Sequence, residues 1–338
     1  MSPLPLFDPG LNIAAQQFNP VLTAILAAGK DLDSPAVYLA VIALLYVGFH
    51  PKYGIRLAVL FGIAGGLNDA LKLFFHLPRP YWISSAVKAY NFPTSFGFPS
   101  GGAMFSTVVY GYAALVVRRY WVVAVCLVLA AWTILARIFS GVHFVLDVLG
   151  GMAFGVLLLV LFFVLSPKVE AFAAGLRPRE RILGILFLSA LPLLVALPAY
   201  VSLAGWQVPT GWVTTAMVQA GIAINPVQVS TAWQSAGLIL GSLLGYEFLR
   251  SRGGWNPPAE FRARAAVAAA GVITTLALYG LAKAALALPG AVIPSPVVLF
   301  IPVALAGFWF TACVPLLARR GLKAIRKKED GVFLPRQP

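Results

Sequence analysis

Apolar residues in this chain are gathered into long runs, separated by short stretches that hold most of the charges. A helix of about 20 such residues crosses about 30 Å of hydrocarbon, because each residue adds about 1.5 Å. The fold predicted from this pattern is all-α, a polytopic transmembrane bundle of about nine spans. The predicted spans are residues 35–50, 55–75, 101–117, 119–139, 146–166, 182–201, 229–249, 265–287 and 297–318.

Composition agrees with a membrane protein. Hydrophobic residues make up 60% of the 338 and charged residues only 11%, against about 25% charged in an average soluble domain. The formal net charge of +14 does not indicate a nucleic-acid partner, because Lys and Arg sit in short clusters between the apolar runs and at the C-terminus. The two cysteines, Cys126 and Cys313, lie far apart in apolar runs, so no disulfide, metal site or cofactor is expected.

Basic clusters predict the orientation in the membrane. They alternate with the spans so that all fall on one side, which the positive-inside rule makes cytoplasmic, together with the C-terminus. The clusters are Lys52 and Arg56, Arg118 and Arg119, the residues 168–181, the residues 250–264 and the tail from Arg319. The expected location is a plasma membrane of bacterial or archaeal type, with residues 76–100 and 140–145 outside.

Five segments are predicted along the chain. Residues 1–34 carry apolar positions at helical spacing but are too polar to span, which indicates an interfacial helix. Residues 35–166 form a front core that holds the candidate chemistry, and 182–318 form additional spans of unknown role. A cytoplasmic linker at 167–181 joins them, and 319–338 form a basic cytoplasmic tail.

Three clusters of polar residues stand at the predicted outer ends of spans. In the first, Lys72 precedes Arg79-Pro80 by seven residues, and charges at membrane depth cost about 2.5–3.5 kcal/mol, so they need a reason. Snorkelling of both cations to lipid head groups is the simpler explanation for this cluster alone. In the second, Ser100-Gly101-Gly102 begins a helix, where backbone N–H groups favour an anion, although an ordinary N-cap explains it equally well.

The third cluster contains Arg137, His143 and Asp147. His143 and Asp147 are four residues apart, so on a helix they share one face, and the carboxylate can orient the imidazole. A single buried histidine is usually structural, but one beside an intramembrane aspartate and an arginine is a candidate nucleophile. All three clusters fall on the predicted outer side of the membrane. The motifs are identified from their residues alone, so this agreement is independent support.

Together these motifs resemble the signature of the type 2 phosphatidic acid phosphatase superfamily: Lys, six residues, Arg-Pro; then Pro-Ser-Gly; then Arg, five residues, His, three residues, Asp. The resemblance covers about residues 35–165. It implies that a phosphate is held by the residues Lys72, Arg79, Ser100, Gly101, Gly102 and Arg137. It also implies that His143 forms a phosphohistidine, with Asp147 as its orienting partner, and that no metal takes part.

Two positions depart from the family pattern. The histidine that usually follows Pro-Ser-Gly is Gly102 here, and the serine that usually precedes the arginine of the third motif is Ala136. The missing histidine is the family's expected general acid, a role worth about 10²–10⁴ in rate. His76, four residues after Lys72, is a possible substitute, although an interfacial histidine bonded to water or a head group is the simpler explanation.

The function predicted from the resemblance is that of a membrane-embedded lipid phosphate phosphatase or lipid pyrophosphatase, with its site at the outer face. A pyrophosphate leaving group would need no acid, which would account for Gly102. Two alternatives stay open: a phosphotransferase that moves the phosphoryl group to another acceptor, and a non-catalytic protein that binds lipid phosphates. The sequence predicts no partner other than lipids and gives no oligomeric state.

Overall fold

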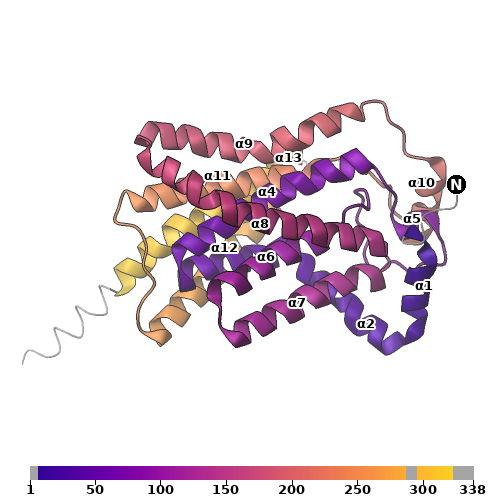
Figure 1. Ribbon diagram of the computed structural model, residues 1–338, viewed down its shortest axis with the longest axis horizontal. Coiled ribbons are helices and arrows are strands. Elements are labelled where there is room, and N and C mark those ends of the chain that lie inside the picture. Colours follow the sequence, from indigo (N-terminus) through magenta and orange to yellow (C-terminus); the bar gives the residue numbers. More distant parts are fainter. Residues whose placement is uncertain (1–6, 287–294, 323–338) are drawn as a thin grey trace, which may run out of the picture. The chain divides into compact units, whose positions relative to one another are not determined.

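The computed structural model describes residues 7–286 and 295–322 of the chain. Every regular element in these ranges is a helix, in agreement with the predicted all-α class (Figure 1). Contacts divide the chain into two compact units. The first consists of the residues up to Tyr38 and Val59–Ala236, and the second of Leu39–Ala58 and the residues from Gly237 onward.

The first unit contains most of the helices. They are α1 (Pro9–Phe18), α2 (Pro20–Ala28), the 3-10 helix η2 (Gly29–Asp33), the greater part of α4 (Pro51–Phe75), α5 (Pro80–Ile83), α6 (Gly101–Val117), α7 (Tyr120–Phe139), α8 (Val145–Gly175), α9 (Pro178–Ser202) and α10 (Thr210–Ala220). The second unit holds all or most of α3 (Pro35–Leu44), the π-helix η3 (Leu45–Phe49), α11 (Ser230–Arg250), α12 (Phe261–Leu286), α13 (Ser295–Phe308) and the π-helix η4 (Trp309–Cys313).

Local sequence accounts for several helix starts. Proline stands at the first position of α1, α2, α5 and α9, where a helix needs no backbone N–H donor. The Asp8 carboxylate accepts a hydrogen bond from the Gly10 N–H at 2.9 Å, and the Asn19 side chain accepts one from Leu22 N–H at 3.0 Å. These N-caps divide the N-terminal segment into two short helices rather than one.

The centre of the first unit is α6, which packs against α7 and α8. The approach of α8 depends on Gly151, because a Cβ there would lie 2.4 Å from the Ser100 carbonyl oxygen. Figure 1 shows α1 and α5 at the end of the helices where α7 stops and α8 begins. Contacts of α1 with α7 and of α5 with α10 hold this end together.

In the second unit, α12 packs against α13, η3 and η4. Two buried hydrogen bonds fix η3 there. The Tyr46 hydroxyl donates to the Thr311 carbonyl at 3.0 Å, and the Trp255 indole N–H donates to the Val47 carbonyl at 3.0 Å. The carbonyl groups that a π-helix leaves without regular partners are thereby satisfied.

Among the described residues, 6 helices are long and apolar enough to cross a membrane, or up to 7 if the bent pair Pro20–Asp33 and Pro35–Phe49 forms one span. The chain is therefore an integral, multi-pass membrane protein. The predicted count of about nine spans is not confirmed. Helices do lie at all nine places, but α6 is a shorter apolar helix and α11 is not among the 6.

The predicted linker at 167–181 is largely helical, since α8 continues through Pro167 to Gly175 and α9 begins at Pro178. The division of the sequence into five segments, and the interfacial position of residues 1–34, stay predictions. The tail from residue 323 and residue 287, the last of the predicted eighth span, lie outside the described residues.

Candidate active site

The predicted site residues come from the ends of five helices in the first unit. Lys72 lies in the last turn of α4, and Arg79 directly precedes α5. Ser100 is the N-cap of α6, and Arg137 is in the last turn of α7. His143 lies between α7 and α8, whose first turn holds Asp147. Every one of these side chains is buried.

Arg79 connects two loops of the site. Its Nε donates to the Ser95 carbonyl at 2.6 Å, and its Nη2 donates to the Ser95 hydroxyl at 3.1 Å and the Phe96 carbonyl at 3.0 Å. Its Nη1 donates to the Val142 carbonyl at 3.0 Å and lies 3.1 Å from Nε2 of His143. The guanidinium group is thus fixed in place beside one ring nitrogen of the histidine.

The other ring nitrogen of His143 faces Asp147. The distance from Nδ1 to Asp147 Oδ2 is 3.2 Å, and the same oxygen accepts the Phe144 backbone N–H at 2.9 Å. A carboxylate can only accept here, so we assign the proton to Nδ1 and the lone pair to Nε2, which accepts from Arg79. This tautomer presents a nucleophilic nitrogen toward the cations.

The pKa of His143 is lowered well below its ordinary value of 6.5, first by burial and then by the positive charges of Arg79, Lys72 and Arg137. The imidazole is therefore neutral at neutral pH, and its contact with Asp147 is a hydrogen bond rather than an ion pair. A neutral imidazole keeps the lone pair that a nucleophile needs.

Lys72 holds the loop that follows α5. Its ammonium group donates to the Phe96 carbonyl at 2.6 Å and lies 3.4 Å from the Gly97 carbonyl. Both acceptors are neutral carbonyl groups, so the positive charge of Lys72 stays available to an anion bound nearby.

Asp69 does not hold Lys72 by a hydrogen bond in the described structure. Its carboxylate instead accepts the Ala232 backbone N–H at 2.8 Å, at the N-terminal end of α11.

Arg137 is held in a different way from Arg79. Its Nη1 donates to the Asp33 carboxylate at 2.9 Å, whereas Nε and Nη2 are buried and have no hydrogen-bond partner among the described residues. An unpaired buried donor costs roughly 1–3 kcal/mol, so two on one guanidinium group need an explanation. An anion that accepts both hydrogen bonds would supply it, because two neighbouring N–H groups match two oxygens of a phosphate.

The start of α6 closes the cluster. The Ser100 hydroxyl accepts from the Ala103 N–H at 3.4 Å, which is the ordinary N-cap that the sequence left open as an alternative. The Ser100 backbone N–H donates to the Asp147 carbonyl at 2.9 Å and so ties α6 to α8. Gly101 is the first residue of α6, so the positive end of the helix dipole is next to Ser100 and its bond to Asp147.

Sequence reasoning missed Asp33, and the space around Gly102 explains its importance. A Cβ at Gly102 would lie 2.6 Å from Asp33 Oδ2 and 2.9 Å from Arg137 Cδ. The Asp33 carboxylate therefore occupies the room that a side chain at Gly102 would need. The only sequence signal is an aspartate beside an apolar run, which Asp31 shows as well.

Sequence reasoning also missed two amides of α1. Asn12 Nδ2 donates to the His143 carbonyl at 2.9 Å and to the Ile138 carbonyl at 3.0 Å. Gln16 donates to the Phe139 carbonyl at 2.9 Å. The loop that carries His143 is thus fixed from the N-terminal helix.

His76 does not join the cluster. Its side chain is exposed, its Nδ1 lies 3.0 Å from the Phe74 carbonyl, and its ring contacts Phe96 and Trp206. Its backbone is left-handed, with φ 39°, a conformation that ends α4. No hydrogen bond or ion pair among the described residues connects His76 to Arg137 or His143, so an acid role for His76 has no geometric support.

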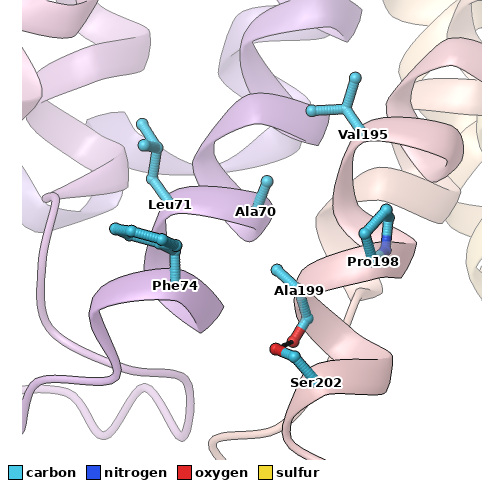
Figure 2. A pocket seen from close by; sticks show the side chains of 7 residues that line it. All are labelled: Ala70, Leu71, Phe74, Val195, Pro198, Ala199 and Ser202. Atoms are coloured by element: carbon cyan, nitrogen blue, oxygen red, sulfur yellow. Dashed lines mark hydrogen bonds between the residues drawn. The ribbon is translucent and has the colours of Figure 1, made fainter.

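An open groove of about 490 Å³ lies between α4 and α9, lined mainly by apolar side chains such as Phe74, Val195 and Pro198 (Figure 2). At 100° per residue, Phe74 lies on the face of α4 turned away from Lys72. The groove is separate from the polar cluster. The described residues contain no group of three or more His, Cys, Asp or Glu side chains that could hold a metal ion.

Comparison with known proteins gives two family matches. Residues 53–171 match the model described as PAP2 superfamily, and residues 233–324 match that described as PAP2 superfamily phosphatase, transmembrane extension. Every predicted site residue falls within the first match, whereas Asn12, Gln16 and Asp33 lie before it.

Two curated relatives are similar to part of the chain. Phosphatidylglycerophosphatase B of Bacillus subtilis (strain 168) is 28% identical over 166 residues, which cover 45% of this chain and 79% of the relative. Lipid phosphate phosphatase delta of Arabidopsis thaliana is 24% identical over 169 residues, which cover 46% of this chain and 41% of the relative. No solved structure matches the chain.

Proposed function

Since this chain carries a PAP2 superfamily domain and the transmembrane extension of PAP2 phosphatases, which makes it a phosphatase-type hydrolase, we propose that it removes phosphate from lipids through a phosphohistidine at His143. The observation that carries the proposal is the position of His143. One ring nitrogen faces Asp147, and the other lies 3.1 Å from Arg79. A general acid would need a protonated ring, whereas a nucleophile needs a neutral lone pair turned toward the cations that hold the phosphate.

In the first step, the substrate phosphate lies against Arg79, Lys72 and the two unpaired nitrogens of Arg137, Nε and Nη2. The His143 Nε2 lone pair attacks phosphorus while the bond to the leaving oxygen breaks and its electron pair stays on that oxygen. Fixed cations stabilise the charge that spreads over the equatorial oxygens. The Asp147 carboxylate, bonded to Nδ1–H, stabilises the imidazole as it becomes positive.

In the second step, a water molecule attacks phosphorus on the phosphohistidine. The bond to Nε2 breaks, its electron pair returns to the ring, and inorganic phosphate leaves. A covalent intermediate divides one difficult displacement into two easier ones.

The substrate class is a lipid phosphate monoester or lipid pyrophosphate. The names of the two relatives, phosphatidylglycerophosphatase B and lipid phosphate phosphatase delta, favour a phosphorylated lipid. A site at the ends of membrane helices also lets the apolar tail of the substrate remain in the bilayer. We place the site at the extracytoplasmic face, on the alternation of basic clusters along the chain.

The test is phosphate release by the purified protein in detergent, from a lipid monophosphate and from the corresponding pyrophosphate. The control pair is His143→Ala and His50→Ala, because His50 is exposed and belongs to the second unit. We expect release that the His50 variant keeps and the His143 variant loses. Phosphate release that persists in His143→Ala would show that His143 is not the nucleophile.

One rival function is a phosphotransferase, in which the phosphohistidine passes its phosphoryl group to an acceptor other than water. The same assay distinguishes it. A transferase would give phosphohistidine without fast phosphate release and would discharge only when an acceptor alcohol is added.

A further inference from the structure

The replacement of a family histidine by Gly102 leaves the proposed reaction without its usual acid, and the structure fills that place from a distant part of the chain. Asp33, at the end of η2, puts Oδ2 2.6 Å and Cγ 2.9 Å from where a Cβ of residue 102 would stand. The glycine and the aspartate are therefore complementary, since any larger residue at 102 would collide with the carboxylate.

The carboxylate of Asp33 is held at both oxygens. Oδ1 accepts from the Tyr38 hydroxyl at 3.0 Å, and Oδ2 accepts from Arg137 Nη1 at 2.9 Å. Its side chain is 18% exposed, whereas that of Asp31, two residues earlier, is 77% exposed and pairs with Lys30 on the surface. Asp33 thus has a fixed position beside Arg137, whose Nε and Nη2 have no partner among the described residues.

We propose that Asp33 is the proton donor to the leaving group, a role that the family gives to the histidine missing here. This inference rests on the proposed function. As Nε2 of His143 bonds to phosphorus, the Asp33 carboxylic acid transfers its proton to the leaving oxygen, which departs as a neutral alcohol. In the second step the Asp33 carboxylate takes a proton from the attacking water and returns to the acid form.

The proton enters with the substrate. Asp33 is paired with Arg137 in the free protein, but a phosphate bound to Arg137 places a second negative charge beside the carboxylate. Two negative charges in a buried site repel, so the carboxyl group takes up the proton of a bound phosphate monoanion, which remains as the dianion. The charges of both steps then balance without a further reactant.

Other acid groups near the site are engaged elsewhere. Asp147 Oδ2 faces His143 Nδ1 and accepts the Phe144 N–H, although Oδ1 has no hydrogen-bond partner among the described residues. Asp69 accepts the Ala232 N–H. The His76 ring is exposed, and its hydrogen-bonding contact among the described residues is with the Phe74 carbonyl rather than with a side chain of the site. Asp33 also lies outside residues 53–171, so a comparison limited to the family domain does not include it.

The test compares leaving groups in the full-length protein. Release of the leaving group in the first turnover is measured for a long-chain alkyl phosphate, whose alkoxide needs a proton, and for 4-nitrophenyl phosphate, whose phenolate leaves without one. The second step, which both substrates share, does not enter this measurement. We expect Asp33→Asn to slow the alkyl substrate by about 10²–10⁴-fold, the usual worth of a general acid, and the aryl substrate by less than about 10-fold. Asp31→Asn, the exposed neighbour, should match the wild type on both.

Equal losses on the two substrates, or no loss on either, would contradict the acid role. The failure of the proposed function would look different, because then the wild type would release no phosphate, or His143→Ala would retain release. A structural defect is recognised separately, because a misfolded Asp33→Asn would have a lower melting temperature in detergent than the wild type.

Moving the acid from position 33 to position 102 tests whether Asp33 occupies the place of the family's histidine. Gly102→His alone should inactivate the protein, because its Cβ meets Asp33 and Arg137. The double variant Asp33→Ala with Gly102→His should release phosphate from the alkyl substrate at least about 10-fold faster than Asp33→Ala, since an imidazole then replaces the acid. The approach of the new Cβ to Arg137 Cδ is common to the single and the double variant, so a double variant no faster than Gly102→His alone would contradict the shared position.

Discussion

Arg79 and Arg137 look alike in the sequence, yet the structure uses them differently. Arg79 donates from Nε, Nη1 and Nη2 to protein acceptors, whereas Arg137 keeps Nε and Nη2 unpaired. The first arginine therefore organises the loops around His143 as well as supplying charge. The second is the side chain whose hydrogen-bonding capacity is left for a ligand.

We predict that Arg79→Lys destabilises the protein more than Arg137→Lys does. A lysine is a point charge without the planar fork, so about three carbonyl bonds would be lost, roughly 2–4 kcal/mol at about 1 kcal/mol each. Arg137→Lys should cost less than about 1 kcal/mol but weaken phosphate binding about 10-fold. Thermal unfolding in detergent, with and without inorganic phosphate, measures both, and equal melting temperatures would refute the distinction.

His143 gives a prediction on pH. Its pKa is lowered in the folded protein by burial and neighbouring cations, so between that lowered value and the ordinary 6.5 the unfolded chain binds more protons than the folded one. Stability contributed by the neutral imidazole is therefore complete above pH 6.5 and is lost as the pH falls below it. His143→Gln should remove this part of the slope in melting temperature between pH 7.5 and 5, and an unchanged slope would contradict the lowered pKa.

At the scale of elements, the N-terminal helix α1 acts as a clamp on the loop between α7 and α8. Asn12 bonds the carbonyl groups of Ile138 and His143, and Gln16 bonds that of Phe139. The Ile138 carbonyl also accepts the Gly141 N–H at 3.0 Å, so Asn12 adds a second hydrogen bond at the end of α7. The clamp fixes the backbone from which the nucleophile projects.

We predict that Asn12→Ala lowers kcat about 10–100-fold with little change in KM, because small misplacements of a reacting group can cost about 10²-fold. Asn19→Ala is the matched control, since it removes the N-cap of α2 without touching His143. The control should lose stability but keep kcat. If both variants reduce kcat alike, the helix acts through stability alone.

The elements themselves follow from the sequence more closely than the site does. Helices stand at all nine predicted places because a long apolar run in a membrane protein has few alternatives to a helix. The continuation of α8 through Pro167 was not predicted, since the charges after it suggested a linker. The split of residues 10–30 at Asn19 follows from a cap that the apolar pattern alone does not reveal.

Six site residues could be proposed from local spacing because each motif is short. Asp33 could not, because it meets Arg137 across 104 positions and no pattern along the chain connects them. The same holds for Asn12, which is 131 positions from His143. Contacts of this kind appear only once the helices are assembled.

At the scale of the whole molecule, sidedness in the membrane is the main open prediction. In a variant without Cys126 and Cys313, a cysteine introduced by Lys88→Cys should react with a membrane-impermeant thiol reagent in intact cells, because residue 88 is exposed near the site. One introduced by Lys168→Cys, also exposed, should react only after permeabilisation. The reverse pattern would place the site on the cytoplasmic face.

The central claim is that His143 carries the phosphoryl group, and the most direct measurement is mass spectrometry of the protein mixed with 4-nitrophenyl phosphate and quenched in alkali, where phosphohistidine survives. The account predicts a phosphoryl adduct on the peptide that contains His143, at higher occupancy in Asp33→Asn because its second step is slower. An active enzyme with no adduct, or with the adduct on another residue, would contradict it.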